Sequence, residues 1–143
     1  RSFFRGVDVS HVFTAADVAR KDHVTVMERP GVSVRAALER LREYDGSAAV
    51  VHDRSRKYQG VVSIDSLIAC IDGLGRREEG RIEQAFLEDV NPVVADTPLT
   101  ELMTQVAESP YPVPVVDSDG RYQGTISRAT LLHTLNRTEK GAA

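Results

Sequence analysis

The sequence predicts a mixed α/β (α+β) protein made of two tandem β-α-β-β-α repeats, packed as a pseudo-two-fold pair. The first observation is the tripeptide Tyr-Gln-Gly, which occurs at 58–60 and again at 122–124. The second is that flanking residues agree at the same spacing, as in the pairs Asp53/Asp117, Ser63/Ser127 and Leu67/Leu131. One such repeat is too small to bury its own apolar face, so we expect the two copies to fold together.

The first repeat begins with a predicted strand at 24–27, after which Pro30-Gly31 turns the chain. Ser33 is a predicted N-cap for a helix over 34–44, whose apolar residues fall on one face at helical spacing. Strands are predicted at 48–51 and 58–62. A helix then starts at Ser63, and we expect Gly73 to end it.

The second repeat has the same order of elements. Residues 92–94 predict a strand, and Thr97 is a predicted N-cap with Pro98 in the first helical position. Strands follow at 113–116 and 122–126, joined by a hairpin turn at Asp117-Ser118-Asp119-Gly120. The last predicted helix covers 128–135.

The repeats and their joints give a provisional division of the chain. We expect a connector at 1–14, the first repeat at 15–72, a linker with a short helix at 73–86, the second repeat at 87–137 and a tail at 138–143. Thr14-Ala15-Ala16-Asp17 has the pattern of a capping box and predicts a helix before the first strand.

Composition and charge exclude several classes of function. A net charge of −3 argues against a nucleic-acid partner, which would require a strongly basic face. Cys70 is the single cysteine, which excludes a disulfide framework and a cysteine zinc site, and the four histidines lack metal-ligand spacing. No apolar run reaches the roughly 20 residues needed to cross a bilayer. We find no constellation of catalytic residues and expect no enzyme activity.

The segment from Pro112 to Ser127, with the order β-α-β-β-α occurring twice, resembles the cystathionine-β-synthase (CBS) domain pair, or Bateman module. The resemblance covers about 15–137. It implies a regulatory module, with adenosine ligands bound between paired repeats and homodimers formed through the helices.

A narrower resemblance involves the opening residues Phe3-Phe4-Arg5-Gly6-Val7-Asp8-Val9-Ser10 and the stretch from Gly60 to Leu67. Both look like the ATP-binding subunit of glycine betaine/proline ABC transporters. This implies an osmoprotectant importer's regulatory domain, cytoplasmic and peripheral to the inner face of the plasma membrane, with an ATPase core and a permease as partners. The chain opens at Arg1, and we expect it to be a fragment whose connector leads from that core.

The ATPase motifs themselves are not in this sequence. It contains neither a Gly-x-x-x-x-Gly-Lys-[Ser/Thr] loop nor the family's Leu-Ser-Gly-Gly-Gln signature, so we expect no ATP hydrolysis by this chain.

The CBS resemblance also implies a binding site. In the family, a Ser or Thr at the end of the third strand and an Asp three residues later hold the ribose and phosphate of the ligand. Ser63 and Ser127 occupy the first position, whereas Ser66 and Thr130 replace the Asp, so both ribose-reading carboxylates are missing. No cofactor is certain, and the candidates are an adenine nucleotide and cyclic di-adenosine monophosphate.

The second repeat is the better candidate for an anion. Asp65 in the first helical turn of the first repeat would repel a phosphate, whereas Arg128 in the second repeat would attract one. We therefore expect Ser127, Thr130 and Arg128 to contact phosphate, with Tyr111 as a stacking surface.

Simpler interpretations stay open for each residue. Ser63 and Ser127 can be ordinary N-caps, Arg128 a solvated arginine and Tyr111 a packing residue. The run Arg76-Arg77-Glu78-Glu79 is a solvated patch or a contact sensitive to ionic strength. The alternative function for the whole module is that of a dimerisation scaffold that no longer binds nucleotide.

Overall fold

The computed structural model describes residues 13–21, 25–29, 33–44, 46–74 and 81–142. The charged run at 76–79, the turn at 30–31 and the connector up to residue 12 lie outside the described residues. The chain forms two compact units, and each is described by itself. The repeat-1 unit is Asp22–Val90, and the repeat-2 unit combines 13–21 with 91–142.

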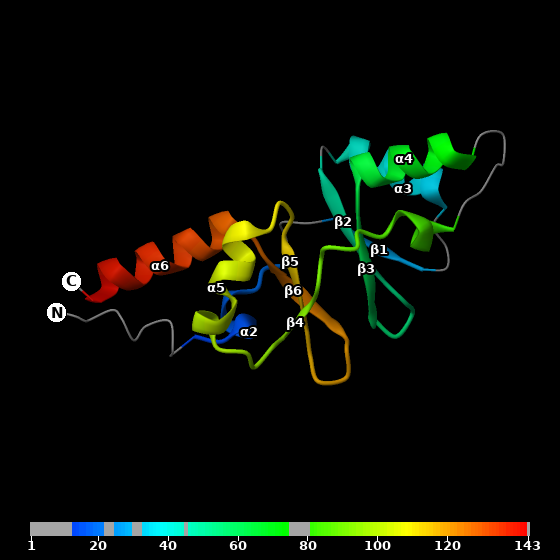
Figure 1. Cartoon of the computed structure of the whole chain (residues 1–143). Coiled ribbons are helices and arrows are strands. Elements are labelled where there is room, and N and C mark those ends of the chain that lie inside the picture. Colours follow the sequence, from blue (N-terminus) through cyan, green and yellow to red (C-terminus); the bar gives the residue numbers. More distant parts are fainter. Residues whose placement is uncertain (1–12, 22–24, 30–32, 45, 75–80, 143) are drawn as a thin grey trace. The chain divides into compact units, whose positions relative to one another are not determined.

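The repeat-1 unit has a three-stranded sheet in the order β1-β2-β3 (Figure 1). Strand β1 (Thr25–Glu28) runs parallel to β2 (Ala48–His52), which pairs antiparallel with β3 (Tyr58–Ser63). The helices α3 (Val34–Glu43) and α4 (Ile64–Leu74) pack together against it. Their apolar faces and the strands form one core, which includes Met27, Leu41, Val62 and Leu67.

The repeat-2 unit repeats this arrangement with β4-β5-β6. Strand β4 (Val93–Val94) is parallel to β5 (Val113–Val116), and β5 is antiparallel to β6 (Tyr122–Ile126). Its helices are α2 (Ala15–Val18), α5 (Leu99–Glu108) and α6 (Arg128–Ala142). The core contains Leu99, Leu102, Val115 and Ile126. The predicted class, a mixed fold of two β-α-β-β-α repeats, is confirmed.

Two local predictions about helix ends are wrong. Gly73 lies inside α4, which extends at least to Leu74, so this glycine does not end the helix. Thr97 is not the N-cap of α5, because Pro98 takes that place with extended backbone and Leu99 begins the helix. The Leu99 N–H donates instead to the Phe13 carbonyl at 2.8 Å, so a segment distant in sequence satisfies the helix end.

Each unit is completed by the short segment that precedes the other repeat. Residues 13–20, which lead into repeat 1, pack in the repeat-2 unit, where Ala15 and Val18 are buried in the core. The 3-10 helix η2 (Ile82–Ala85), which leads into repeat 2, packs in the repeat-1 unit through Ile82 and Ala85. The compact units therefore differ from the repeats as they follow one another in the sequence.

These segments explain why the repeated Tyr-Gln-Gly motif ends in glycine. A Cβ on Gly60 would lie 2.6 Å from the Phe86 ring, just after η2. A Cβ on Gly124 would lie 3.0 Å from the Arg20 carbonyl oxygen and 3.1 Å from the Ala19 Cβ, just after α2. In both repeats, the absent side chain lets the incoming segment lie directly on the third strand.

Among the described residues, we find no helix with the length and apolar character needed to cross a membrane.

Candidate functional site

The candidate residues lie in two equivalent turns, where the third strand of each unit passes into the following helix. Ser63 ends β3 before α4, and Ser127 stands between β6 and α6. The structure thus brings Ser63 close to Ser66, and Ser127 close to Thr130.

The turn of the repeat-1 unit is closed by its own hydrogen bonds. The Ser63 hydroxyl accepts from the Ser66 N–H at 3.0 Å. The Ser66 hydroxyl accepts from the Ser63 N–H at 2.9 Å and donates to the Ser63 carbonyl at 3.1 Å. Ser63 is only 2% exposed. This reciprocal arrangement is that of a capping box, with the hydroxyls used inside the turn.

The turn of the repeat-2 unit is more open. The Ser127 hydroxyl accepts from the Thr130 N–H at 3.1 Å, and the two hydroxyl oxygens lie 2.9 Å apart in a hydrogen bond. Ser127 and Thr130 are both half-buried. Two adjacent hydroxyls therefore stand partly accessible at the start of α6, where the helix dipole favours negative charge.

Arg128 extends this cluster toward the loop between α5 and β5. Its guanidinium is exposed, and Nε and Nη2 both donate to the Ser109 carbonyl, at 3.2 and 3.1 Å. Ser109 is the C-cap of α5, so its carbonyl lies at the negative end of that helix. This contact explains how an arginine is tolerated in the first turn of α6.

The same loop holds Tyr111. The Ser109 hydroxyl donates to the Tyr111 carbonyl at 2.6 Å and lies 3.3 Å from the Tyr111 nitrogen, from which it accepts. Arg128, Ser109 and Tyr111 thus form a connected group beside Ser127. Ser109 could not be identified from the sequence, because its contact with Arg128 uses the backbone carbonyl and carries no side-chain signal.

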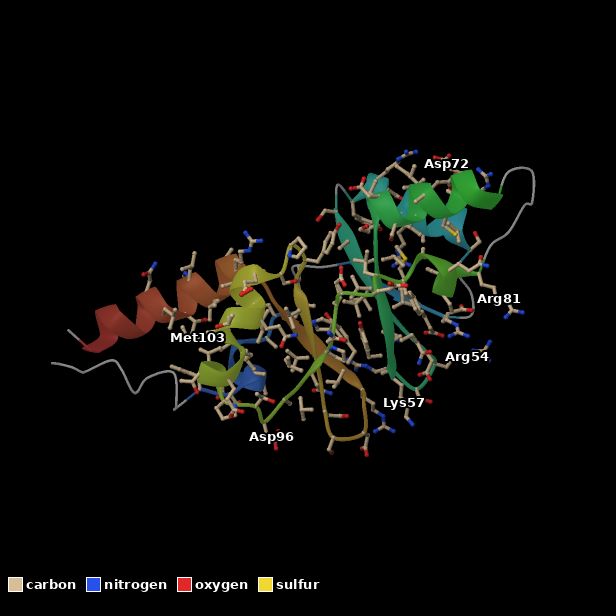
Figure 2. The ribbon with its side chains drawn as sticks, viewed as in Figure 1. Arg54, Lys57, Asp72, Arg81, Asp96 and Met103 are labelled. Carbon is tan, nitrogen blue, oxygen red and sulfur yellow. The ribbon has the colours of Figure 1, made fainter. Side chains whose placement is uncertain are left out.

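Charge also distinguishes the hairpins, which lie at the end of each third strand away from these turns. Figure 2 shows Arg54 and Lys57 at the tip of the β2–β3 hairpin. The β5–β6 hairpin carries one exposed acid, Asp119, and one exposed base, Arg121. Backbone hydrogen bonds, the one from Arg121 first, hold the pKa of Asp117 below its ordinary value of 3.8. In β3, burial raises the pKa of Tyr58 to about 12.

The described residues that could bind a metal ion are spread over the two units. Among the described residues there is no cluster of three or more His, Cys, Asp or Glu side chains suited to a metal ion. Cys70 is half-buried and packs against the core from α4. The Nδ1 atom of His52 is 2.7 Å from the Asp53 carbonyl, and His133 is exposed.

Comparison with known proteins places both repeats in one family. The CBS domain family matches residues 15–73 and 84–137. The chain is 44% identical over 138 residues to the glycine betaine/proline betaine transport system ATP-binding protein ProV of Salmonella typhimurium. It is 32% identical over 137 residues to the glycine betaine/carnitine transport ATP-binding protein GbuA of Listeria monocytogenes. Both matches cover 96% of this chain but 33% of the relative, so the chain spans about a third of their length.

Solved structures agree on the fold. CbpB in complex with c-di-AMP aligns with a TM-score of 0.76 and 17% identity, covering 93% of both chains. CBSX2 in complex with AMP aligns with a TM-score of 0.70 and 24% identity, covering 89% of this chain and 98% of the other. Staphylococcus aureus OpuCA gives a TM-score of 0.70 and 20% identity, covering 85% and 98%.

The predicted resemblance to the CBS domain pair is thereby confirmed. The chain belongs to the CBS domain family, as a tandem CBS pair whose relatives are ATP-binding subunits of glycine betaine transport systems.

Proposed function

We propose that this chain is the regulatory CBS pair of the ATP-binding subunit of an osmoprotectant (glycine betaine/L-proline) ABC transporter. The observation that carries the proposal is the 44% identity to ProV over 96% of the chain. The partners are then the ATPase core and the permease, and the location is the cytoplasmic side of the membrane. As part of this proposal, the two repeats extend over 15–72 and 87–137.

We further propose that an adenine-type ligand binds at the repeat-2 turn. Ser127, Thr130 and Arg128 contact its phosphate, and Tyr111 offers a stacking surface. The half-buried hydroxyls at the start of α6 and the adjacent guanidinium support this choice. AMP and c-di-AMP, the ligands of CBSX2 and CbpB, are the candidates to test.

The repeat-1 turn is the weaker candidate. Its two serine hydroxyls are used within the turn, and Asp65 adds a negative charge in the first turn of α4. Ser66 and Thr130 replace the ribose-reading carboxylates in both repeats. We therefore expect binding energy to come mainly from phosphate contacts, with little discrimination through the ribose.

Isothermal titration calorimetry of the chain with AMP, ATP and c-di-AMP tests the site. Removing a charge-assisted hydrogen bond costs about 1.5–3 kcal/mol, so Arg128→Ala should weaken binding by roughly 10- to 100-fold. Arg35→Ala is the matched control, because Arg35 is also an exposed arginine in the first turn of a helix. Equal affinity of the Arg128→Ala and Arg35→Ala variants would refute the assignment, and no heat with any nucleotide would refute nucleotide binding.

We also propose that the module responds to ionic strength, and one ion pair supports this. The Arg29 Nε lies 3.2 Å from a Glu83 carboxylate oxygen, and both side chains are 35% exposed. The pair connects the end of β1 to η2, the segment that leads into repeat 2. Because salt screens exposed charges, this contact weakens as ionic strength rises.

A dimerisation module is the alternative function, and exposed apolar side chains favour it. Leu132 on α6 is 61% exposed, and Tyr44 at the end of α3 is 64% exposed. Thermal unfolding separates the two functions. A dimerisation module gains stability with protein concentration and is indifferent to nucleotide, whereas a binding module gains stability with ligand.

A further inference from the structure

The two segments that cross between the units occupy equivalent places on the two third strands. Each contains a short helix, and the residue at the end of each segment forms a backbone hydrogen bond to the strand residue two positions before the candidate serine. We propose that these crossed segments couple each helix-start turn to the chain entering the opposite repeat. The Ser127 turn is thereby linked to residues 14–20, and the Ser63 turn to residues 81–87.

In the repeat-2 unit, the coupling contact is a pair of backbone hydrogen bonds. The Arg20 N–H donates to the Thr125 carbonyl, and the Thr125 N–H donates to the Arg20 carbonyl, both at 2.8 Å. Thr125 lies in β6, is 1% exposed and stands two residues before Ser127, which begins the turn after that strand. Any shift of that turn therefore acts on Arg20 through a single buried residue, Thr125.

Further backbone hydrogen bonds attach the rest of this segment to the repeat-2 unit. The Ala15 N–H donates to the Thr97 carbonyl, and the Ala16 N–H donates to the Ala95 carbonyl, each at 2.9 Å. The Phe13 carbonyl accepts from the Leu99 N–H at the start of α5. Helix α2 also contacts β6 and α6. The segment is thus an integral part of the unit that holds Ser127, although repeat 1 follows it in sequence.

The repeat-1 unit has the corresponding contact. The Leu87 N–H donates to the Val61 carbonyl at 2.8 Å, and Val61 stands two residues before Ser63. Arg81 forms an isolated antiparallel β-bridge with Ser33 at the start of α3, and Thr14 forms the equivalent β-bridge with Pro98 at the start of α5. The crossing therefore occurs in both directions, with two backbone hydrogen bonds in the repeat-2 unit and one in the repeat-1 unit.

This arrangement assigns a direction to regulation, a consequence that rests on the proposed function. Whatever precedes residue 13 is attached to the unit of the second repeat. A ligand at Ser127 would then act on the entering chain directly, whereas a change at Ser63 would act on the joint between the repeats.

Hydrogen exchange of the ligand-free 143-residue chain tests the coupling without any nucleotide. Ser127→Ala and Ser63→Ala remove the same type of cap from equivalent turns, so each serves as the control of the other. We expect Ser127→Ala to speed exchange of the Arg20 amide by roughly fivefold and to leave the Leu87 amide unchanged. Ser63→Ala should do the reverse.

A second variant acts on the contact itself. Gly124→Ala places a Cβ 3.0 Å from the Arg20 carbonyl, at a φ of +153° that L residues rarely adopt, and should speed exchange at Arg20 and Ala16. Gly73→Ala, where no atom lies within 4 Å of the added Cβ, is the control. The coupling is overturned if Ser63→Ala acts on Arg20, if both serine variants act equally on both amides, or if neither variant nor Gly124→Ala changes them. Failure of nucleotide binding in the calorimetric test would leave these exchange results unaffected.

Discussion

Replacing Gly60 by alanine tests the structural reason for the repeated Tyr-Gln-Gly motif. The new Cβ would lie 2.6 Å from two atoms of the Phe86 ring and 2.8 Å from a third, closer than real Cβ atoms approach other atoms. Phe86 is half-buried and packs against the core of the repeat-1 unit. The ring must move off β3, and the core loses part of its contact with it.

The magnitude follows from two opposing effects. Overpacking at a close contact costs about 1–3 kcal/mol. The loss of a glycine from the unfolded chain offsets roughly 0.5 kcal/mol, because alanine has less conformational freedom to lose. We therefore expect Gly60→Ala to lower the free energy of unfolding by about 0.5–2.5 kcal/mol, measured by urea denaturation.

A double-mutant cycle shows whether Phe86 is the cause. Once Phe86→Ala has removed the ring, Gly60→Ala should be neutral or slightly stabilising, which gives a coupling free energy of about 1–3 kcal/mol. Gly73→Ala is the control, since it adds a methyl group in open space within α4 and should stabilise by about 0.5–1 kcal/mol. If Gly60→Ala costs the same with and without the Phe86 ring, the explanation of the motif is wrong.

Two further predictions concern charged groups. The backbone N–H groups of Arg121 and Asp119 donate to the Asp117 carboxylate and hold its pKa below the ordinary value of 3.8. The ionised carboxylate therefore stabilises the folded state above pH 3.8. This stabilisation is lost as the pH falls through the lowered pKa. Asp117→Asn should therefore be less stable than wild type at pH 7 and equal to it in strong acid by urea denaturation, while Asp119→Asn changes little; a constant difference at all pH values would contradict this. Glu83→Gln should lower stability by up to about 1 kcal/mol at low salt and by nearly nothing at 1 M NaCl, since both partners are partly exposed. A salt-independent loss would show that the effect is not electrostatic.

Much of each repeat could be predicted because local patterns and local hydrogen bonds agree. The Ser33 hydroxyl accepts from the Ala36 N–H at 3.1 Å, as the predicted N-cap requires. The predicted hairpin turn is present, with Gly120 at φ +85° and its N–H donating to the Asp117 carbonyl. The short helix at 15–18 also forms, with the Asp17 carboxylate accepting from the Thr14 N–H at 2.9 Å.

The errors and omissions arise from contacts between distant parts of the chain. Thr97 has the residue type of an N-cap, but its carbonyl is taken by Ala15 and the helix is capped from Phe13. The crossing of the two segments could hardly be predicted from the sequence. Residues 14–20 and 81–87 occupy equivalent places in the two units, but they have no identical residue at equivalent positions. One weak signal was available in Asp17 and Gln84, whose side chains both accept from the backbone N–H three residues before them.

The candidate site was predicted in its residues but not in its connections. The serine turns follow from the repeat, and their internal hydrogen bonds from capping chemistry. That Arg128 binds the Ser109 carbonyl, and that Ser109 in turn holds Tyr111, depends on how the α5–β5 loop folds back onto α6. No pattern of residue types announces a contact to a backbone carbonyl.

Amide chemical shifts recorded while AMP or c-di-AMP is added to the chain test the functional proposal most directly. We expect the first shifts to be confined to Ser127, Arg128, Thr130 and Tyr111 and to saturate as ligand is added. Shifts centred on Ser63 and Ser66, or a spectrum unchanged at millimolar ligand, would contradict the proposal.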